Sequence, residues 1–274
     1  MKLSNFTKKG KYLMLALDHR GSFKKYVNKK NPEAAGNKEI ADVKSLIIKA
    51  CDNAMSGFLI DPVWGLPAYK KSKVKKPYLL CLEKTGYMET KGARLTKLQY
   101  TGKQLKKWGA SGAKILLYFN PALKTATAKQ LSVAKKALTD AHKNNLPLFL
   151  EIVTYGNEEL KKTRAEWVLK SLQAFTKAKI NPDIFKLEYP GSSEACKKIT
   201  KLISPTPWII LTRGETFNVF KKQLKNAIAA GAVGFLAGRA VWQEIGDFKT
   251  TVVRQKFAKT ITKRFKELTK IALK

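Results

Sequence analysis

The sequence has 274 residues, with 54 Lys and Arg against 20 Asp and Glu, so its formal net charge is +34. This length can bury a sizeable core, and a composition that is 44% hydrophobic and 10% aromatic argues against a disordered chain. Three widely spaced cysteines predict buried thiols rather than a disulfide framework, and two histidines are too few for a three-histidine zinc site.

The N-terminus carries basic residues followed by a short apolar run, Tyr12–Leu17, which ends at Asp18. The run is far shorter than a membrane span and no small-residue cleavage site follows it, so we interpret it as a strand and not as a signal peptide. No other apolar run approaches membrane-spanning length. We therefore expect a cytoplasmic protein that binds no membrane.

Short, almost continuously apolar runs recur along the chain, each followed by a polar break and then a longer helical pattern. Such runs are typical of parallel strands that are buried on both faces. The eight predicted strands, in chain order, are Tyr12–Asp18, Gly57–Asp61, Pro77–Glu83, Ala113–Phe119, Pro147–Val153, Asp183–Tyr189, Pro207–Thr212 and Val233–Gly238.

The stretches between these strands are amphipathic, with small and apolar residues on one helical face and lysines on the other. A basic helix over Val252–Lys274 is expected to close the barrel rather than bind a membrane. The other predicted helices are Ile40–Ala54, Leu98–Trp108, Ala126–Asn144, Glu158–Lys179 and Val219–Ala230.

Eight strands alternating with helices favour an α/β fold with a single (β/α)8 TIM barrel, formed as one domain by residues 1–274. An open doubly wound sheet is the alternative. No GxGxxG motif follows the first predicted strand, which weakens a dinucleotide-binding interpretation of that alternative.

Ionisable residues gather at the C-terminal ends of the predicted strands, which is where (β/α)8 barrels carry their chemistry. One such residue could belong to an ordinary ion pair, but so many at one end of the barrel predict a functional pocket. The group comprises Asp18, His19, Arg20, Asp61, Glu83, Lys84, Glu151, Lys186, Glu188, Arg213 and Arg239, with Lys114 early in its strand.

Lys186 is the most informative of these residues because it lies inside an apolar strand, in the segment IFKLEY. A buried lysine needs a partner or must lose its proton, and a neutral lysine can attack a carbonyl to form a Schiff base. A structural ion pair with Glu188, two residues along the same face, is the alternative. If Lys114 and Glu151 also point inward, a second ammonium would favour the neutral form of Lys186 and a carboxylate could move protons.

The last two strands end in ILTRGETF and FLAGRAVW, which both place small residues and an arginine at the strand end. Phosphate binds at this position in many such barrels, because glycine lets backbone N–H groups approach and arginine supplies a forked donor. The predicted phosphate-binding residues are Arg213, Gly214, Gly238 and Arg239.

Seven segments between Leu15 and Gln243 resemble, in a consistent order, the class I tagatose-1,6-bisphosphate aldolase family of Schiff-base-forming barrels. The chain is also similar to sulfofructosephosphate aldolases and to the aldolase-like domain of inositol catabolism, toward which DHRGSF and LTRG lean. The segments are LALDHRGSF, LIDPVWGLPA, LEKTGY, AKILLYFNP, PLFLEIVTY, PDIFKLEYP and GFLAGRAVWQ.

The resemblance implies a class I aldolase that uses no metal or other cofactor and acts on a small sugar phosphate. Lys186 would form the imine with the ketose, Glu151 would be the acid and base, and Lys114 would be an auxiliary cation beside the imine. Asp18 and Arg20 would contact substrate hydroxyls or a phosphate, and Gly214, Gly238 and Arg239 would hold a phosphate. His19, Asp61, Glu83 and Glu188 complete the predicted substrate-binding set.

Two positions depart from the bisphosphate aldolases that the chain resembles. His19 stands where they usually have Gln, and Arg213 replaces a small residue. Both positions affect substrate choice. Reversible cleavage of tagatose or fructose 1,6-bisphosphate to dihydroxyacetone phosphate and glyceraldehyde 3-phosphate is the leading hypothesis. Cleavage of another sugar phosphate, such as 6-phospho-5-dehydro-2-deoxygluconate, is the alternative.

The high positive charge raises a different hypothesis, a basic nucleic-acid-binding protein. That hypothesis predicts clustered arginines or aromatics interleaved with basic residues. The chain instead has 47 lysines, dispersed over nearly every predicted helix, and seven arginines, of which three belong to the predicted pocket. We therefore expect no specific nucleic-acid partner, and a homo-oligomer remains open.

Overall fold

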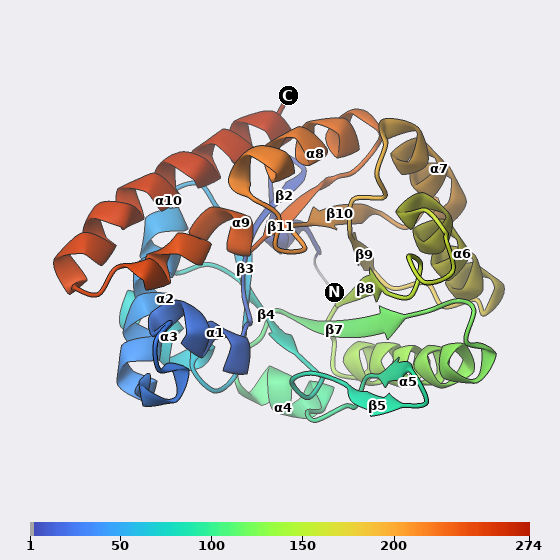
Figure 1. The fold of residues 1–274 in the computed structure, drawn as a ribbon, viewed down its shortest axis with the longest axis horizontal. Coiled ribbons are helices and arrows are strands. Elements are labelled where there is room, and N and C mark those ends of the chain that lie inside the picture. The colour runs from blue at the N-terminus through green and yellow to red at the C-terminus, as the bar shows by residue number, and fades with distance from the viewer. Residues whose placement is uncertain (1–2) are drawn as a thin grey trace.

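The computed structural model describes residues 3–274, and eight parallel strands form its frame (Figure 1). Around the barrel the order is β2, β11, β10, β9, β8, β7, β4, β3, and β3 pairs back onto β2 to close the sheet. All eight predicted strands are present, so the (β/α)8 barrel is confirmed. Their bounds are β2 Lys11–Leu17, β3 Gly57–Ile60, β4 Tyr78–Cys81, β7 Gly112–Phe119, β8 Leu148–Thr154, β9 Ile184–Leu187, β10 Trp208–Leu211 and β11 Gly234–Ala237.

Helices cover the outside of the barrel, and α10 (Thr251–Ala272) completes this layer between α2 and α8 (Figure 1). Phe265 of α10 packs edge-on against Phe235 of β11, with ring centroids 5.4 Å apart. The remaining helices are α1 Gly21–Val27, α2 Asn37–Cys51, α3 Gly65–Ser72, α4 Gly102–Lys107, α5 Lys124–Lys143, α6 Arg164–Lys177, α7 Ser193–Ile203, α8 Phe217–Ala229 and α9 Arg239–Trp242. Over residues 3–274, no helix has both the length and the apolar character that a membrane crossing requires.

Two helices begin later than their sequence patterns predict, and a capping box sets the start of each. Thr163 accepts a hydrogen bond from the Glu166 backbone, and the Glu166 side chain accepts one from the Thr163 N–H, so α6 starts at residue 164 and not 158. Thr101 and Gln104 make the same reciprocal pair at α4.

The side chains of the strands alternate between two apolar layers, as the pleat requires. Leu13, Leu15 and Leu17 of β2 point outward into the large cluster shared with the helices. Met14 and Ala16 point inward and join the barrel interior. That interior cluster consists of Phe6, Tyr12, Met14, Ala16, Leu59, Leu79, Phe149, Ile184, Ile209 and Leu236.

The N-terminal segment fills the bottom of the barrel. The 3-10 helix η1 (Leu3–Phe6) leads into β1 (Thr7–Lys8), which pairs antiparallel with β2. Phe6 is fully buried and packs edge-on against Phe149, with ring centroids 5.5 Å apart. In the part of the chain that the structure describes, the barrel interior is therefore packed at its N-terminal end and opens toward the C-terminal ends of the strands.

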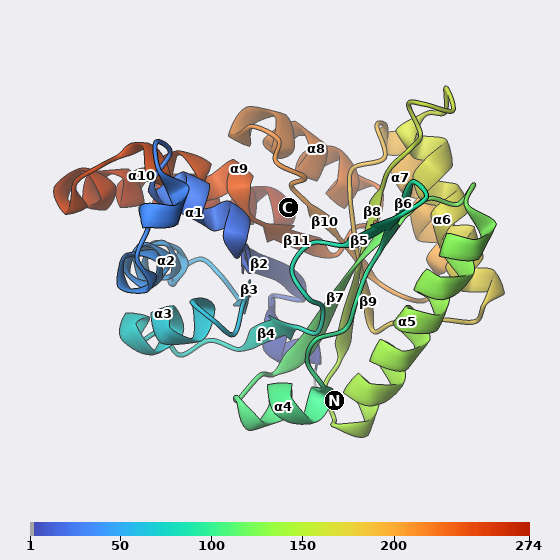
Figure 2. The ribbon, with the colours of Figure 1, turned by 60° about the horizontal axis from the view of Figure 1, so that its bottom comes forward.

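One element that the sequence patterns do not predict is the hairpin of β5 (Met88–Thr90) and β6 (Ala93–Leu95), which Figure 2 shows beside β7 and α5. Gln130 of α5 fixes it. Its Nε2 donates to the carbonyls of Arg94 (3.2 Å) and Tyr118 (2.8 Å), and its Oε1 accepts from the N–H of Thr96 at 3.1 Å. The hairpin thus lies over the C-terminal end of β7.

Candidate active site

A cavity of about 590 Å³ opens where the C-terminal ends of the barrel strands meet their loops. Most of the residues predicted for the site line this cavity, although they come from segments more than 200 positions apart. The predicted residues in the lining are Asp18, His19, Arg20, Glu83, Lys114, Glu151, Lys186, Arg213, Gly238 and Arg239.

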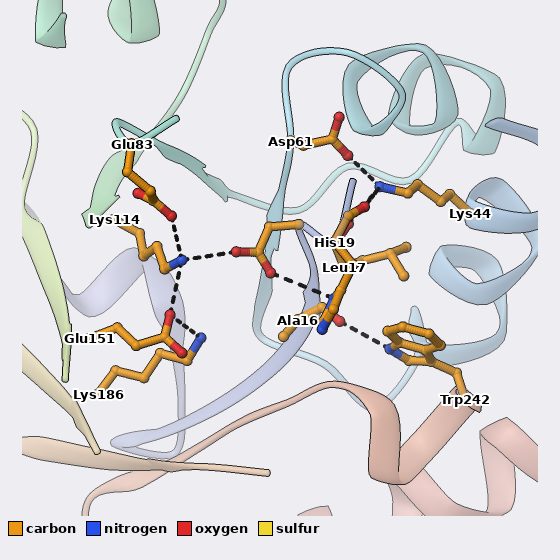
Figure 3. A network of polar contacts seen from close by, with 11 residues as sticks. Ala16, Leu17, His19, Lys44, Asp61, Glu83, Lys114, Glu151, Lys186 and Trp242 are labelled. Carbon is orange, nitrogen blue, oxygen red and sulfur yellow. Dashed lines mark hydrogen bonds and ion pairs between the residues drawn. The ribbon is translucent and has the colours of Figure 1, made fainter. Parts of the chain in front are cut away.

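Lys114 is the centre of the polar network on the cavity floor (Figure 3). Its ammonium lies 2.7 Å from Glu83 Oε1, 3.0 Å from Asp18 Oδ2 and 2.9 Å from Glu151 Oε2. The side chain is only 2% exposed. Strands β2, β4, β7 and β8 and the loops after them therefore converge on one buried cation.

The charges of this network determine how each group holds its proton. Burial alone would lower the pKa of Lys114, but Asp18, Glu151 and Glu83 raise it well above its ordinary value. Burial opposes the ionisation of Asp18 and Glu151, yet the ammonium groups of Lys114 and Lys186 hold both carboxyl pKa values below their usual range. Burial raises the pKa of Glu83 against the pull of Lys114.

Lys186 on β9 enters the network through Glu151. Its Nζ lies 2.9 Å from Glu151 Oε2, the same oxygen that Lys114 contacts (Figure 3). The register explains this contact, because Glu151 of β8 is the partner of Lys186 on β9. The alternative pair between Lys186 and Glu188 is not formed. β9 ends at Leu187, so the strict alternation of sides ends before residue 188.

Glu188 and Arg213 form an ion pair beside the cavity. Glu188 is fully buried, outside the lining, and accepts a hydrogen bond from the N–H of Thr154 at 2.9 Å. Arg213 Nη2 donates to the carbonyl of Thr154 at 2.9 Å. Burial, with Arg164 as the next cause, lowers the pKa of Arg213 to about 10.

Asp61 is also outside the cavity lining, although it follows its strand as predicted. It is fully buried and forms an ion pair with Lys44 of α2 (Figure 3). Its Oδ1 accepts the N–H groups of Val63 and Trp64, at 2.9 and 2.8 Å, just before α3 begins. The structure therefore places Asp61 in the layer between barrel and helices.

His19 lies in the cavity wall against Trp242, with ring centroids 5.1 Å apart and an interplanar angle of 82°. Burial lowers the pKa of His19 to about 4, while Asp18, whose Oδ1 is 3.9 Å from Nδ1, acts in the opposite direction. Lys44 donates to the His19 carbonyl at 2.8 Å and thereby fixes the backbone of this loop. The imidazole is thus held neutral in the physiological pH range.

The predicted phosphate position is built by the loops after β10 and β11. Gly214 has φ +82°, and a Cβ added there would lie 2.9 Å from Cζ of Arg239. Gly214 itself is outside the cavity lining, but its missing side chain leaves room for the guanidinium of Arg239. Arg239 and the preceding residue, Gly238, both line the cavity. The structure brings these three residues together.

Several lining residues have no counterpart in the sequence-based prediction. Arg94 comes from the unpredicted hairpin, and Tyr118 lies four positions after Lys114, on the same face of β7. The alternation along β7 could have identified Tyr118. Lys84, which belongs to the predicted group of ionisable residues, also lines the cavity. The further unpredicted lining residues are Ala16, Ser22, Thr85, Gly86, Leu116, Val153, Leu211, Thr212 and Leu236.

Comparison with known proteins finds several aldolases that are similar to this chain. The chain is 30% identical over 262 residues to tagatose 1,6-diphosphate aldolase of Staphylococcus aureus (strain MW2), covering 83% of this chain and 79% of that protein. A solved Schiff-base-forming fructose-1,6-bisphosphate aldolase is similar with a TM-score of 0.66 at 22% identity, covering 95% of this chain and 96% of the other. An archaeal fructose-1,6-bisphosphate aldolase, whose catalytic Lys is bound to a carbinolamine intermediate, gives a TM-score of 0.70 at 19% identity, covering 99% and 98%.

The family model described as DeoC/LacD family aldolase matches residues 12–244. This range contains all eight barrel strands from Tyr12 onward and the whole cavity lining. The chain therefore belongs to the DeoC/LacD family of aldolases, and the enzyme is a lyase.

Proposed function

We propose that this aldolase works through a Schiff base on Lys186 and cleaves a phosphorylated ketose. The observation that carries the proposal is the contact of two buried ammonium groups, Lys114 and Lys186, with the same Glu151 oxygen at 2.9 Å. A lysine nucleophile needs a base within hydrogen-bond reach, and Glu151 supplies it. Lys114 holds that carboxylate in place from its other side.

Imine formation begins when Lys186 transfers a proton to Glu151 and its free amine attacks the ketone carbon. One proton moves from the attacking nitrogen to the former carbonyl oxygen to give the carbinolamine, whose hydroxyl takes the second proton from Glu151 and leaves as water, which gives the iminium. Lys186 is one of the groups that keep the pKa of Glu151 low. Once its proton is gone, that effect is lost and Glu151 becomes a stronger base, while Lys114 stays protonated and holds the carboxylate in place.

Carbon–carbon cleavage uses the iminium as an electron sink. Glu151, directly or through another group, removes the proton from the C4 hydroxyl. The C3–C4 bond breaks, its electron pair moves toward the iminium nitrogen to form an enamine, and the aldehyde product leaves. Protonation of the enamine carbon and hydrolysis of the imine release the ketone product and restore Lys186.

The charge of the cavity supports a substrate with two anionic groups. Seven Lys and Arg side chains line it against three carboxylates, Asp18, Glu83 and Glu151. The relatives from Staphylococcus aureus are named for tagatose 1,6-diphosphate. We propose a ketohexose 1,6-bisphosphate, tagatose or fructose, with the phosphate next to the ketone bound by the backbone around Gly238 and by Arg239.

A second candidate substrate is 6-phospho-5-dehydro-2-deoxygluconate. It is favoured by His19 and Arg213, the two positions at which the chain departs from the bisphosphate aldolases it resembles. Both side chains line the cavity, so both departures can change which substrate binds. This compound keeps a phosphate next to the ketone and carries a carboxylate at its other end. The Schiff-base chemistry on Lys186 is the same for both candidates.

Trapping the imine tests the chemistry. Borohydride with dihydroxyacetone phosphate is expected to leave a covalent adduct that peptide mapping locates on Lys186, and Lys186→Met should form none. Lys44→Met is a matched control because Lys44 is equally buried and paired with a carboxylate but lies outside the cavity. An adduct on Lys114, or no adduct in the wild-type protein, would contradict the assignment.

Steady-state cleavage of both hexose bisphosphates and of 6-phospho-5-dehydro-2-deoxygluconate, each with and without a chelator, tests the substrate. We expect the highest kcat/KM for a bisphosphate and no effect of the chelator. A higher kcat/KM for the carboxylate-ended compound would favour the second candidate, and activity lost with the chelator would contradict the Schiff-base mechanism.

A further inference from the structure

The cations that line the cavity differ in whether a carboxylate already neutralises them. Lys114, Lys186 and Arg213 are paired with acidic side chains. Arg20 donates to the Glu83 carbonyl at 2.9 Å. Within residues 3–274, the remaining lining cations have no acidic side chain within ion-pair distance. These are Lys84, Arg94 and Arg239.

Arg239 belongs to the predicted phosphate position, which leaves Lys84 and Arg94. Of these two, Arg94 is held more firmly by its neighbours. Its guanidinium carbon lies 4.8 Å from the ring centroid of Tyr155 and 5.1 Å from that of Tyr87. Its backbone N–H donates to the Tyr155 hydroxyl at 2.8 Å. Tyr87 in turn packs on Tyr118, with centroids 4.8 Å apart. Aromatic faces orient a guanidinium without using its N–H donors, so the fork stays free for an anion.

The topology places Arg94 across the barrel mouth from the predicted phosphate position. The hairpin lies over β7, where Thr96 Oγ1 donates to the Leu116 carbonyl at 2.8 Å. β7 is four strands from β11 in both directions around the eight-stranded barrel, and β9 with Lys186 is midway between them. Figure 1 shows the hairpin and α9, which begins at Arg239, on opposite sides of the barrel opening.

We propose that Arg94 binds the anionic group at the end of the substrate that is remote from the imine carbon. This inference rests on the proposed Schiff-base function. Arg239 and the adjacent glycine loops then hold the phosphate beside the ketone, Lys186 holds the ketone carbon, and Arg94 holds the far end of the chain. The forked donor fits a phosphate, sulfonate or carboxylate, which all present at least two acceptor oxygens. The unpredicted hairpin thereby determines which aldehyde the enzyme accepts.

The condensation direction tests this proposal, because dihydroxyacetone phosphate stays constant while the aldehyde varies. The panel is glyceraldehyde 3-phosphate, its 3-sulfonate analogue, malonate semialdehyde and uncharged glyceraldehyde. The wild-type enzyme should prefer at least one anionic aldehyde over glyceraldehyde by kcat/KM. In Arg94→Met that preference should fall by about 10- to 100-fold, mainly through KM, because a charge-assisted hydrogen bond to the anion is lost.

Two further variants separate recognition from structure. Lys97→Met removes one positive charge just after the same hairpin, from an exposed side chain outside the cavity lining, and should keep the wild-type preference. Arg94→Lys keeps the charge but loses the fork and the stacking, so it should retain only part of the preference. Borohydride trapping of dihydroxyacetone phosphate on Lys186 shows that a variant is folded and able to form the imine.

The outcomes distinguish this inference from the function on which it rests. No adduct on Lys186 in the wild-type protein would overturn both. An adduct together with equal use of charged and uncharged aldehydes, or a preference that Arg94→Met and Arg94→Lys leave intact, would overturn the role of Arg94 alone. Which anionic aldehyde loses most in Arg94→Met identifies the group at the far end.

Discussion

Replacing Lys114 with methionine tests how far the ammonium that contacts three carboxylates stabilises the protein. The substitution preserves most of the side-chain volume but leaves Asp18, Glu83 and Glu151 without the cation that now lies within 3.0 Å of each. Removing one partner from a buried ion pair typically costs about 3–5 kcal/mol. We expect Lys114→Met to lower the free energy of unfolding by about that amount at pH 7.5.

The pH dependence of this loss follows from the carboxyl groups. Burial already raises the pKa of Glu83 against the pull of Lys114, and without Lys114 that pull is lost, so the folded variant binds more protons than the unfolded one. Stability then falls as pH rises, by about 1.4 kcal/mol per pH unit for each proton taken up. In the wild-type protein the low pKa values of Asp18 and Glu151 stabilise the fold at all pH values above the unfolded values near 4, and that contribution disappears only on further acidification.

The assay is urea unfolding at pH 5.5, 6.5, 7.5 and 8.5, followed by the fluorescence of the five tryptophans. It measures the difference in the free energy of unfolding between variant and wild type. The difference should grow with pH, by roughly 4 kcal/mol over the range for one proton. Lys221→Met is the matched control, because Lys221 is 3.3 Å from Glu267 and both side chains are over one-third exposed. It should change stability by less than about 1 kcal/mol. A loss below about 1 kcal/mol in Lys114→Met, with no dependence on pH, would refute the reasoning.

Three further predictions concern other parts of the structure. Gly214→Ala places a Cβ at φ +82° and 2.9 Å from the Arg239 guanidinium, so the half-saturating concentration of dihydroxyacetone phosphate in borohydride trapping should rise about tenfold; an unchanged value would contradict the predicted phosphate position. An NMR titration should give the His19 imidazole a midpoint near pH 4. Because the unfolded imidazole titrates near 6.5, the unfolded chain binds a proton first, and the folded state loses stability as pH falls from 6.5 toward 4. A midpoint near 6.5 would contradict its burial. Burial raises the pKa of all three thiols, so a thiol reagent at pH 8 should react only after denaturation, and fast reaction of the native protein would be the opposite result. These thiols are Cys51, Cys81 and Cys196.

The barrel could be predicted from the sequence because its strands are buried on both faces. Continuous apolar runs such as those of β3 and β10 carry that signal directly, and their fully buried residues confirm it. The β5–β6 hairpin has no such signal. Its strands are three residues long and none of their residues is buried, so neither apolar continuity nor alternation marks them.

Strand phase places the residues inside strands unambiguously, whereas residues just beyond a strand end divide into two groups: Asp18 after β2 reaches the cavity, and others do not. Lys114, Glu151 and Lys186 lie within regular strands, so period-two alternation brings them to the barrel axis. Asp61 and Glu188 follow the last residue of their strands, and both turn away from the cavity to partners on other elements, Lys44 and Arg213. Those partners come from a helix and a distant loop, which local patterns do not connect.

The packed base of the barrel has a consequence for the order of the reaction. Phe6 and the aromatic and aliphatic side chains around it fill the axis below Lys186, so substrate and both products must use the mouth between the loops. In the proposed mechanism the ketone fragment stays covalently attached to Lys186 until its imine is hydrolysed, whereas the aldehyde is free as soon as the C3–C4 bond breaks. On this mechanism the aldehyde is expected to depart first. In steady-state cleavage dihydroxyacetone phosphate should compete with the bisphosphate, whereas glyceraldehyde 3-phosphate should inhibit noncompetitively, and both products leave through the same opening.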